Sequence, residues 1–273
     1  MPNALLLLVD GLAVAYRAYH AIPSLTSTSG EPTNALFGFI KMVRQLDEQW
    51  RPTHRAVIFD GGLPEALVSQ LDPIVTFLQL AGWSSIRPLD EEADDALATL
   101  AVASAQAGGK VLIASSDKEL LQLVDQRIQV IPPVKAAVPF GPRAARGKMG
   151  VDPEQVVDLL ALMGDTADNI PGVPGIGPKI AAQLLAEFRT LENLWNGLDR
   201  VGSERVRNLL QTHRAAVERN VELMRLRTDL PDLPAVDQLA SRRPDLPGLV
   251  RFLEERDLHS VAKLYQEMEL ELF

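Results

Sequence analysis

Cysteine is absent from the 273-residue sequence, and this absence excludes several kinds of chemistry at once. The chain can form no disulfide bond, no thiolate metal site and no thiol nucleophile. A lack of cysteine also fits a reducing compartment, so we expect a cytoplasmic protein.

Long apolar runs are lacking as well. The apolar stretch of residues 4–9 is short, follows no basic segment and is interrupted by Asp10 and Gly11. A membrane-spanning helix needs about 20 apolar residues, and a secretory signal needs a basic start and a cleavage site with small residues. We therefore interpret residues 4–9 as a strand that is buried on both faces, and we predict no membrane partner.

Hydrophobic residues make up 47% and charged residues 23% of the sequence, which is ordinary for a globular protein with a sizeable core. Short apolar segments alternate with amphipathic ones. This alternation predicts an α/β fold with a mainly parallel central sheet that is flanked by helices. The strands are predicted at 4–9, 56–59, 84–87, 110–114 and 128–131, and the helices at 12–19, 34–49, 73–81 and 91–107.

The pattern changes near residue 153, because the segments that follow are almost all helical. We therefore expect an α/β core over residues 1–152 and a helical region over residues 153–273, packed as one unit. The proline-rich run 231–247 is interpreted as a linker or as a segment that wraps around the core. Helices are predicted at 154–163, 178–188, 190–197, 203–226, 246–256 and 259–268.

Acidic residues recur where the predicted strands end. Because the carboxyl ends of parallel strands lie along one edge of a sheet, residues far apart in the sequence are expected to meet there. Carboxylates gathered in one place repel one another, and Mg²⁺ or Mn²⁺, which prefer oxygen ligands, would relieve that repulsion. Nine such residues would account for the whole net charge of −9, because the sequence has 36 acidic and 27 basic residues. They are Asp10, Asp60, Glu92, Asp94, Asp95, Asp117, Glu119, Asp165 and Asp168.

A single aspartate at the end of a strand is more often a cap or a turn residue than a metal ligand. Asp94 and Asp95 at the start of a helix would be unremarkable on their own. The coincidence of five acidic positions at one predicted edge favours a metal site, because ordinary turns would scatter Lys, Asn and Ser among them.

The stretch of residues 163–180 combines two features. Asp165 and Asp168 are three residues apart, which predicts that both lie on one face of a helical turn. A glycine-rich segment follows at 172–177, before Pro178 and Lys179 begin another helix. Backbone N–H groups at such a place can hold a phosphate.

The glycine-rich segment has two competing interpretations. It nearly matches a phosphate-binding P-loop, but Pro178 intervenes before Lys179 and no strand precedes it. It also lacks the third glycine of a dinucleotide-binding fingerprint. A hairpin between two helices that holds a DNA backbone fits better.

Six segments carry a resemblance to a known family, in the order LLLVDGLAVAYRAYHA, TNALFGF, VIFDGG, EEADDALATLA, IASSDKELLQLV and GDTADNIPGVPGIGPKIAAQLL. The chain resembles the 5′-nuclease family, and within it the bacterial 5′–3′ exonuclease domains at the start of DNA polymerase I, which are related to flap endonucleases. The resemblance covers nearly the whole chain. It implies a PIN-like fold and a stand-alone, two-metal phosphodiesterase that acts on DNA with 5′ flaps, nicks or branches.

The resemblance also implies roles for individual residues. It places Arg17 near the 5′ end of the substrate and a helix-hairpin-helix element over residues 163–188. From the family we expect two or more Mg²⁺ or Mn²⁺ ions, a monomer and an association with the nucleoid. The implied first-metal residues are Asp10, Asp60, Glu92, Asp94 and Asp117, the second-metal residues are Asp95, Asp165 and Asp168, and the DNA-holding residues are Gly172, Val173, Gly175, Ile176, Gly177 and Lys179.

Two features depart from the family pattern. The family has SDKD where this chain has Ser116 to Glu119, and the longer reach of Glu119 is expected to weaken or shift the second ion. Only residues 61–71 separate Asp60 from Asp72, and none of them is Lys or Arg. Family members carry a longer insertion there, which forms a basic helical arch. The sequence therefore predicts that the arch is missing and that the selection of DNA ends is relaxed.

Two alternative functions stay open. Glu119 and the missing arch leave room for a protein that binds branched DNA with weak or no catalysis. An RNA-directed nuclease with the same type of metal site is a further alternative. The basic cluster of Arg143, Arg146 and Lys148 is predicted to lie in a loop, where it is as readily a solvated surface as a phosphate contact.

Overall fold

The computed structural model describes residues 4–22, 24–60, 65–134 and 137–270. The chain divides into two compact units. Unit 1 comprises Met1–Ser116, Ile131–Val138 and Thr228–Phe273, and unit 2 comprises Asp117–Val130 and Pro139–Arg227. Within the described part of the chain, no helix has the length and apolar character needed to cross a membrane.

Unit 1 is built on a parallel sheet, as the alternating segments predicted. The strand order is β3 (Ser84–Ile86), β2 (His54–Ile58), β1 (Leu5–Asp10), β4 (Lys110–Ala114) and β5 (Ile128–Ile131), of which β5 contributes its last residue to unit 1. β1 pairs in parallel with both β2 and β4, and β2 pairs in parallel with β3. The carboxyl ends of β1, β2, β3 and β4 therefore lie along one edge.

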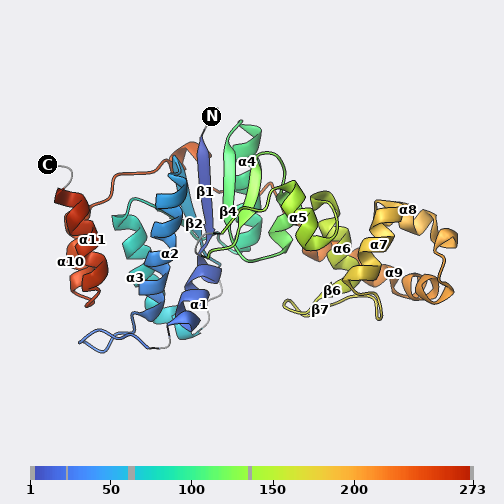
Figure 1. Cartoon of the computed structure of the whole chain (residues 1–273), viewed down its shortest axis with the longest axis horizontal. Helices are drawn as coiled ribbons and strands as arrows, with labels where there is room; N and C mark the ends of the chain where they lie inside the picture. Colours follow the sequence, from blue (N-terminus) through green and yellow to red (C-terminus); the bar gives the residue numbers. More distant parts are fainter. Residues whose placement is uncertain (1–3, 23, 61–64, 135–136, 271–273) are drawn as a thin grey trace. The chain divides into compact units, whose positions relative to one another are not determined.

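Helices cover both faces of this sheet. Figure 1 shows α1 (Gly11–Ala21), α2 (Asn34–Trp50) and α3 (Glu65–Leu80) on one side of the strands and α4 (Ala93–Gln106) on the other. Successive strand residues point to opposite faces. Leu7 and Val9 accordingly belong to the core with α2 and α3, whereas Leu6 and Leu8 are equally buried but lie outside that cluster. Burial on both faces explains why residues 4–9 are apolar without alternation.

α3 begins at Glu65, so the predicted start of this helix at residue 73 is wrong and Pro73 lies inside it. The Gln70 side chain anchors the early part of the helix. Its Oε1 accepts hydrogen bonds from the backbone N–H groups of Ala35 and Leu36 at 2.9 and 3.3 Å, and its amide donates to Asn34 Oδ1 at 2.9 Å. These contacts satisfy the first N–H groups of α2, which have no partners within that helix.

The last residues of unit 1 wrap around the core. After the short 3-10 helix η4 (Val236–Leu239), the N–H of Ser241 donates to Thr53 O at 2.9 Å and that of Asp245 donates to Leu80 O at 2.8 Å. α10 (Leu246–Glu254) and α11 (His259–Leu270) follow, and the ring of Tyr265 meets that of Phe77 edge-on. The proline-rich run is therefore a wrap-around segment and not a free linker.

Unit 2 is mostly helical, as predicted for the region after residue 153. Its principal helices are α6 (Val156–Met163), α7 (Pro178–Phe188) and α9 (Glu204–Met224). Between α6 and α7 lie two short strands, β6 (Gly164–Asp165) and β7 (Ile170–Pro171). The smaller elements are the 3-10 helices η1 (Glu119–Leu123), η2 (Pro153–Gln155) and η3 (Leu198–Arg200) and the helices α5 (Pro142–Met149) and α8 (Leu191–Asn196).

The predicted loop that carries Arg143, Arg146 and Lys148 is wrong, because these residues lie on helix α5. Pro142 occupies its first turn, where a missing N–H costs nothing, and Gly150 ends it with a φ of 79°. Only Ala145 of this helix is buried. Such a short polar helix shows no apolar stripe from which periodicity could identify it.

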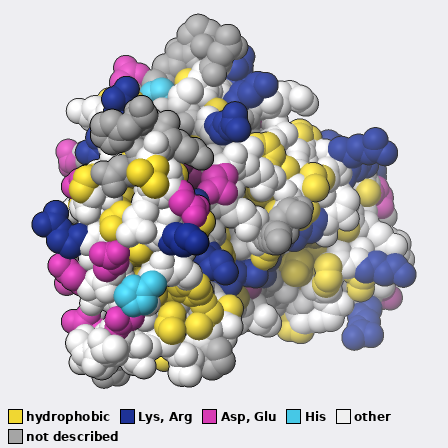
Figure 2. All heavy atoms as spheres, turned by 60° about the vertical axis from the view of Figure 1, so that its left-hand side comes forward, with side chains coloured by type: hydrophobic (Ala, Val, Ile, Leu, Met, Phe, Trp, Pro, Cys, Tyr) yellow, Lys and Arg dark blue, Asp and Glu magenta, His cyan; other side chains and the backbone are white. Residues whose placement is uncertain are grey.

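The net charge of the protein belongs to unit 1, because unit 2 contains equal numbers of acidic and basic residues. Figure 2 shows acidic and basic side chains interspersed over the face that it draws. A negative total charge is therefore no argument against a local contact between unit 2 and a polyanion.

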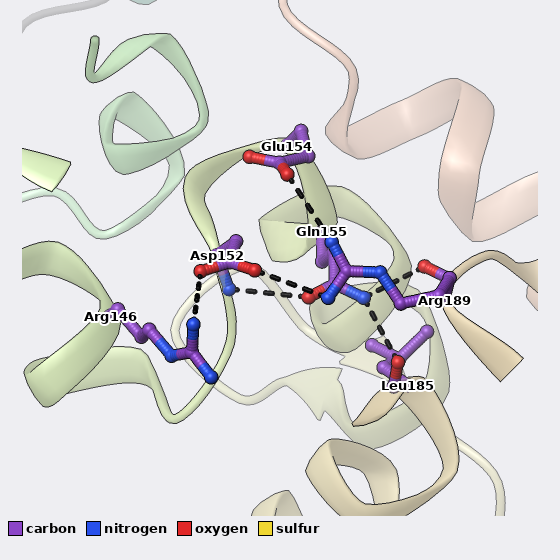
Figure 3. Close-up of polar contacts among 6 residues, drawn as sticks. All are labelled: Arg146, Asp152, Glu154, Gln155, Leu185 and Arg189. Atoms are coloured by element: carbon purple, nitrogen blue, oxygen red, sulfur yellow. Dashed lines mark hydrogen bonds and ion pairs between the residues drawn. The ribbon is translucent and has the colours of Figure 1, made fainter. Parts of the chain in front are cut away.

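The C-terminal end of α7 is held by a buried glutamine (Figure 3). Gln155 is 4% exposed, and its Nε2 donates to the carbonyl oxygens of Leu185 at 3.0 Å and Arg189 at 2.7 Å. Asp152 beside it accepts from Arg146 at 3.0 Å and from Arg189 at 3.2 Å. The N–H of Arg189 also donates to Leu185 O at 3.0 Å. Gln155 therefore adds a second donor at Leu185, satisfies the carbonyl of Arg189, and ties the end of α7 to the start of α6.

Replacing Gln155 by Ala is expected to lower the free energy of unfolding by about 1–3 kcal/mol, because the Arg189 carbonyl loses this donor and the Leu185 carbonyl keeps only the N–H of Arg189. Urea unfolding followed by circular dichroism measures this change. The matched control is Gln211→Ala on the exposed surface of α9, for which a change within about 0.5 kcal/mol is expected. Equal effects of the two substitutions would contradict the anchoring role.

Candidate functional site

Three carboxylates of unit 2 lie close enough together to share a cation. One ligand oxygen from each of Glu119, Asp165 and Asp168 lies within 4.8 Å of the other two. Glu119 begins η1, Asp165 ends β6, and Asp168 lies in the turn that joins β6 to β7. Asp165 is buried and Asp168 is exposed, so the group opens to solvent on one side. Oxygen-only donors in this arrangement suit a hard divalent cation.

The predicted helical turn at Asp165 and Asp168 is wrong. β6 pairs antiparallel with β7, with Asp165 opposite Ile170, and residues 166–169 form the connecting turn. Asp165 Oδ1 accepts from the N–H of Ala167 at 2.9 Å, and Asn169 has a φ of 55°. An aspartate that binds the backbone two residues on favours a turn over a helix. The turn nevertheless brings the two carboxylates together, as their spacing predicted.

Lys118 lies next to the buried carboxylate of this group. Its Nζ is 2.6 Å from Asp165 Oδ2, and the side chain of Asp165 is 1% exposed. Burial raises the pKa of Asp165, but the hydrogen bonds and the charge that Lys118 and the Ala167 N–H supply more than offset this, so that the pKa is lowered. Lys118 therefore keeps Asp165 ionised in the interior.

Asp168 shows the opposite shift. Its pKa is raised, first by burial and then by the negative charges of Asp165 and Asp117. Asp117 is itself held by the backbone, since its Oδ1 accepts from the N–H of Glu119 at 2.7 Å. The negative charges of this group thus repel one another despite Lys118, and a bound cation would relieve that repulsion.

Unit 1 holds candidate carboxylates at the ends of two neighbouring strands. Asp10 ends β1, and its two oxygens accept from the N–H of Ala13 at 2.9 Å and from Ser115 Oγ at 2.8 Å. Asp60 follows β2 and accepts from the N–H of Ala93 at 2.7 Å. Asp10 is therefore the N-cap of α1, as the ordinary interpretation holds, whereas Asp60 satisfies an N–H group in the first turn of α4 from a distant segment. These hydrogen bonds also fix the direction of each side chain.

The hydrogen bond of Asp60 joins it to the start of α4, which carries the next acidic group. Glu92 is the N-cap of α4, and Asp94 and Asp95 lie in its first turn. Unit 1 thus presents five of the nine predicted residues at strand ends and at one helix start. The convergence of all nine on one site involves both units and stays a prediction.

α1 presents an exposed aromatic pair that sequence analysis missed. Tyr16 is 48% exposed, and its ring meets that of His20 edge-on at 4.4 Å between centroids. Arg17 lies between them in sequence, and its Nη2 donates to Ser116 Oγ at 3.3 Å. The signal in the sequence is the four-residue spacing of two rings on the helix that directly follows Asp10.

Some positions of the glycine-rich loop after β7 require glycine, and others do not. A Cβ at Gly172 would overlap the backbone of Met163, and Gly175 has a φ of 80°. A Cβ at Gly177, which is the N-cap of α7, would meet nothing within 4 Å. Val173 and Ile176 are buried and pack the loop onto the unit.

Packing or backbone conformation therefore accounts for the other predicted DNA-holding residues, but not for Gly177 or Lys179. Both are exposed at the N-terminal end of α7. The backbone N–H groups of a helix start and a nearby ammonium group suit a phosphate. The helix-hairpin-helix assignment itself stays a prediction.

Comparison with known proteins adds the family. The N-terminal resolvase-like domain of 5′–3′ exonucleases matches residues 5–63 and 61–157, and their C-terminal SAM fold matches residues 151–247. A 5′–3′ exonuclease of Aquifex aeolicus is 34% identical over 276 residues, which cover 94% of each chain. The chain belongs to the 5′–3′ exonuclease family.

Further relatives of this exonuclease-family chain are longer or more distant. DNA polymerase I of Thermus thermophilus is 38% identical over 278 residues, and the chain spans only 33% of its length. The solved structure of the bacteriophage T5 D15 flap endonuclease, a complex with DNA and metal ions, covers 98% of each chain with a TM-score of 0.63 and 18% identity. At that identity the likeness shows a shared fold.

Substitutions at Glu119 test the metal group directly. Glu119→Gln removes one charged candidate ligand and is expected to weaken Mn²⁺ binding about tenfold, whereas Glu119→Asp, which introduces the residue that the family resemblance implies, is expected to tighten it. Electron paramagnetic resonance of free Mn²⁺ during a titration measures both. Glu192→Gln on α8 is the matched control and should leave binding unchanged. Identical titrations for all four proteins would show that Glu119 is not a ligand.

Proposed function

We propose that the chain is a structure-specific 5′ nuclease, which hydrolyses DNA phosphodiesters near 5′ ends or branch points with divalent cations. The observation that carries this proposal is the group of Glu119, Asp165 and Asp168 in a chain of the 5′–3′ exonuclease family. The likeness to a flap endonuclease complex that contains DNA and metal ions supports it. We further propose a monomer that acts in the cytoplasm on nucleoid DNA.

The donor set fits two or more Mg²⁺ or Mn²⁺ ions, because every candidate ligand is a carboxylate and their charges repel one another. When bound, such ions generate a nucleophilic hydroxide and stabilise the charge on the attacking and leaving oxygens. The nine predicted carboxylates are proposed to hold these ions. Lys118 keeps Asp165 ionised, and the hydrogen bonds of Asp10 and Asp60 hold those side chains in fixed directions.

The chain also offers residues for the DNA itself. Arg17 is proposed to bind a phosphate near the 5′ end, and Tyr16 with His20 offers an aromatic surface on which a base can stack. At the start of α7, Gly177 and Lys179 are proposed to hold a backbone phosphate of the duplex, as the helix-hairpin-helix interpretation requires.

We propose that the helical arch of the family is missing. The match to the N-terminal domain is split into two pieces that meet at residues 61–63, where the sequence is short. α3 begins at Glu65, and residues 61–64 lie outside the described residues. A segment without Lys or Arg cannot thread and clamp a 5′ strand by charge, so we expect relaxed selection of ends and weaker transition-state stabilisation.

Cleavage assays test the function. Labelled flap, nicked and four-way DNA are expected to be cut with Mg²⁺ or Mn²⁺, and Asp168→Ala is expected to lower the rate at least a hundredfold, because a metal ligand is lost. Tight binding in Ca²⁺ with no cleavage in any metal would favour the alternative, a branched-DNA-binding protein, which the longer Glu119 leaves open. The same assay with RNA strands distinguishes an RNA-directed nuclease.

The missing arch predicts how the protein treats a blocked end. Streptavidin on a 5′-biotinylated flap is expected to slow cleavage less than about tenfold, because an open site does not require threading. The matched control is the same flap with free biotin in place of streptavidin. If only free-ended flaps are cut, the strand is threaded and the site is closed by some other segment.

A further inference from the structure

The amide side chain of Gln122 links one of the candidate ligand residues to the end of α9. Its Nε2 donates to the carbonyl oxygens of Glu119 and Met224, each at 3.0 Å, and its Oε1 accepts from the N–H of Leu226 at 3.2 Å. Met224 is the last residue of α9, so no N–H within that helix reaches its carbonyl. Gln122 therefore satisfies the end of α9 and holds the backbone of Glu119 against it.

One helical turn before Met224, α9 also holds the hairpin that carries the other two candidate ligands. Asn220 is 2% exposed, and its Nδ2 donates to the carbonyl oxygens of Ala161 at 3.1 Å and Pro171 at 2.9 Å. Pro171 belongs to β7, which pairs with the strand that contains Asp165. The last turns of α9 are thus a common support for the two chain segments that supply the carboxylates.

A second connection between these two segments is ionic. The Nζ of Lys118 lies 2.6 Å from Asp165 Oδ2, and Lys118 directly precedes Glu119. A divalent cation bound by Asp165 would repel this ammonium group, so we expect the ion pair to weaken when the site is loaded. The hydrogen bonds of Gln122 and Asn220 are made by uncharged amides, which do not oppose a cation in this way. They are therefore the connection that a loaded site can keep.

We propose that Gln122 is a positioning residue for cation binding, because it holds the backbone of Glu119 where the Glu119 carboxylate reaches those of Asp165 and Asp168. One ligand oxygen from each of these three residues lies within 4.8 Å of the other two. Groups that orient a metal ligand typically change metal affinity about ten- to a hundredfold when they are removed. The proposal rests on the proposed metal-dependent function, since it concerns the same carboxylates.

The test compares Mn²⁺ binding by the whole protein and by two variants that lose the same kind of side chain. Gln122→Met keeps the length of the side chain but removes its hydrogen bonds, and it is expected to weaken Mn²⁺ binding at least about fivefold. Gln155→Met makes the same change in an amide that also donates to two carbonyl groups, but at the end of α7. This control should bind Mn²⁺ as the unaltered protein does. Electron paramagnetic resonance measures free Mn²⁺ without DNA, and urea unfolding records the stability of each variant.

A double-mutant cycle shows whether Gln122 acts through Glu119. In the Glu119→Gln protein the ligand is already altered, so the added substitution Gln122→Met is expected to change Mn²⁺ binding less than about twofold. Gln122→Asn is the second variant if Gln122→Met does not fold. It keeps an amide but is one methylene too short to make all three hydrogen bonds, so it should also weaken Mn²⁺ binding.

Three results would overturn the proposal. In the first, Gln122→Met, or Gln122→Asn in its place, binds Mn²⁺ as tightly as the unaltered protein, so that Gln122 only caps α9. In the second, Gln155→Met weakens binding equally, which would make the effect one of general stability. In the third, the effect of Gln122→Met is the same in the Glu119→Gln protein, so that it does not pass through Glu119.

These outcomes are separate from those of the nuclease proposal. If DNA is cut and Mn²⁺ is bound but the Gln122 variants bind normally, only the positioning role fails. If Mn²⁺ binding responds to Gln122 as expected but no DNA is cut in any metal, only the nuclease proposal fails. An unaltered protein that binds no Mn²⁺ would overturn both.

Discussion

A buried carboxylate needs a partner, and in unit 2 the ammonium group of Lys118 is the partner of Asp165 at 2.6 Å. This ion pair joins the segment that precedes η1 to the β6–β7 turn, two parts of the chain that are far apart in sequence. Because Glu119 follows Lys118 and Asp168 lies in the same turn as Asp165, the pair also gathers the three ligand oxygens. The glycine-rich loop continues from β7 and is held by contacts of its own, since Val173 and Ile176 are buried and the N–H of Val173 donates to Leu162 O at 2.9 Å.

The sheet and its acidic edge could be predicted from the sequence because both follow from simple constraints. Strands that are covered on both faces must be apolar throughout, as residues 5–9 are, and polar residues are then confined to the strand ends. Asp10 and Asp60 are found at such ends. The bounds of α7 were equally clear, because Pro178 fits a first turn and the apolar stripe that follows is regular.

The misjudged elements depend on contacts that a sequence does not display. The early turns of α3 are held by Gln70, whose partners lie on α2. The turn at Asp165 is stabilised by a hydrogen bond from the N–H of Ala167 to the Asp165 side chain. Such a bond competes with helix formation. The exposed pair of Tyr16 and His20 was missed for a different reason, since two rings one turn apart on a helix more often pack in a core.

Gln70 makes the position of α3 independent of the segment that precedes this helix. Since the helix is fastened to α2 by three hydrogen bonds of this one side chain, its position does not depend on the number of residues that join it to Asp60. The free energy needed to close a longer connection rises only slowly with its length. Segments can therefore be gained or lost at this point during evolution while the core and its acidic residues stay in place. We propose that the arch, which would select DNA ends, is such a segment and that the fold does not require it.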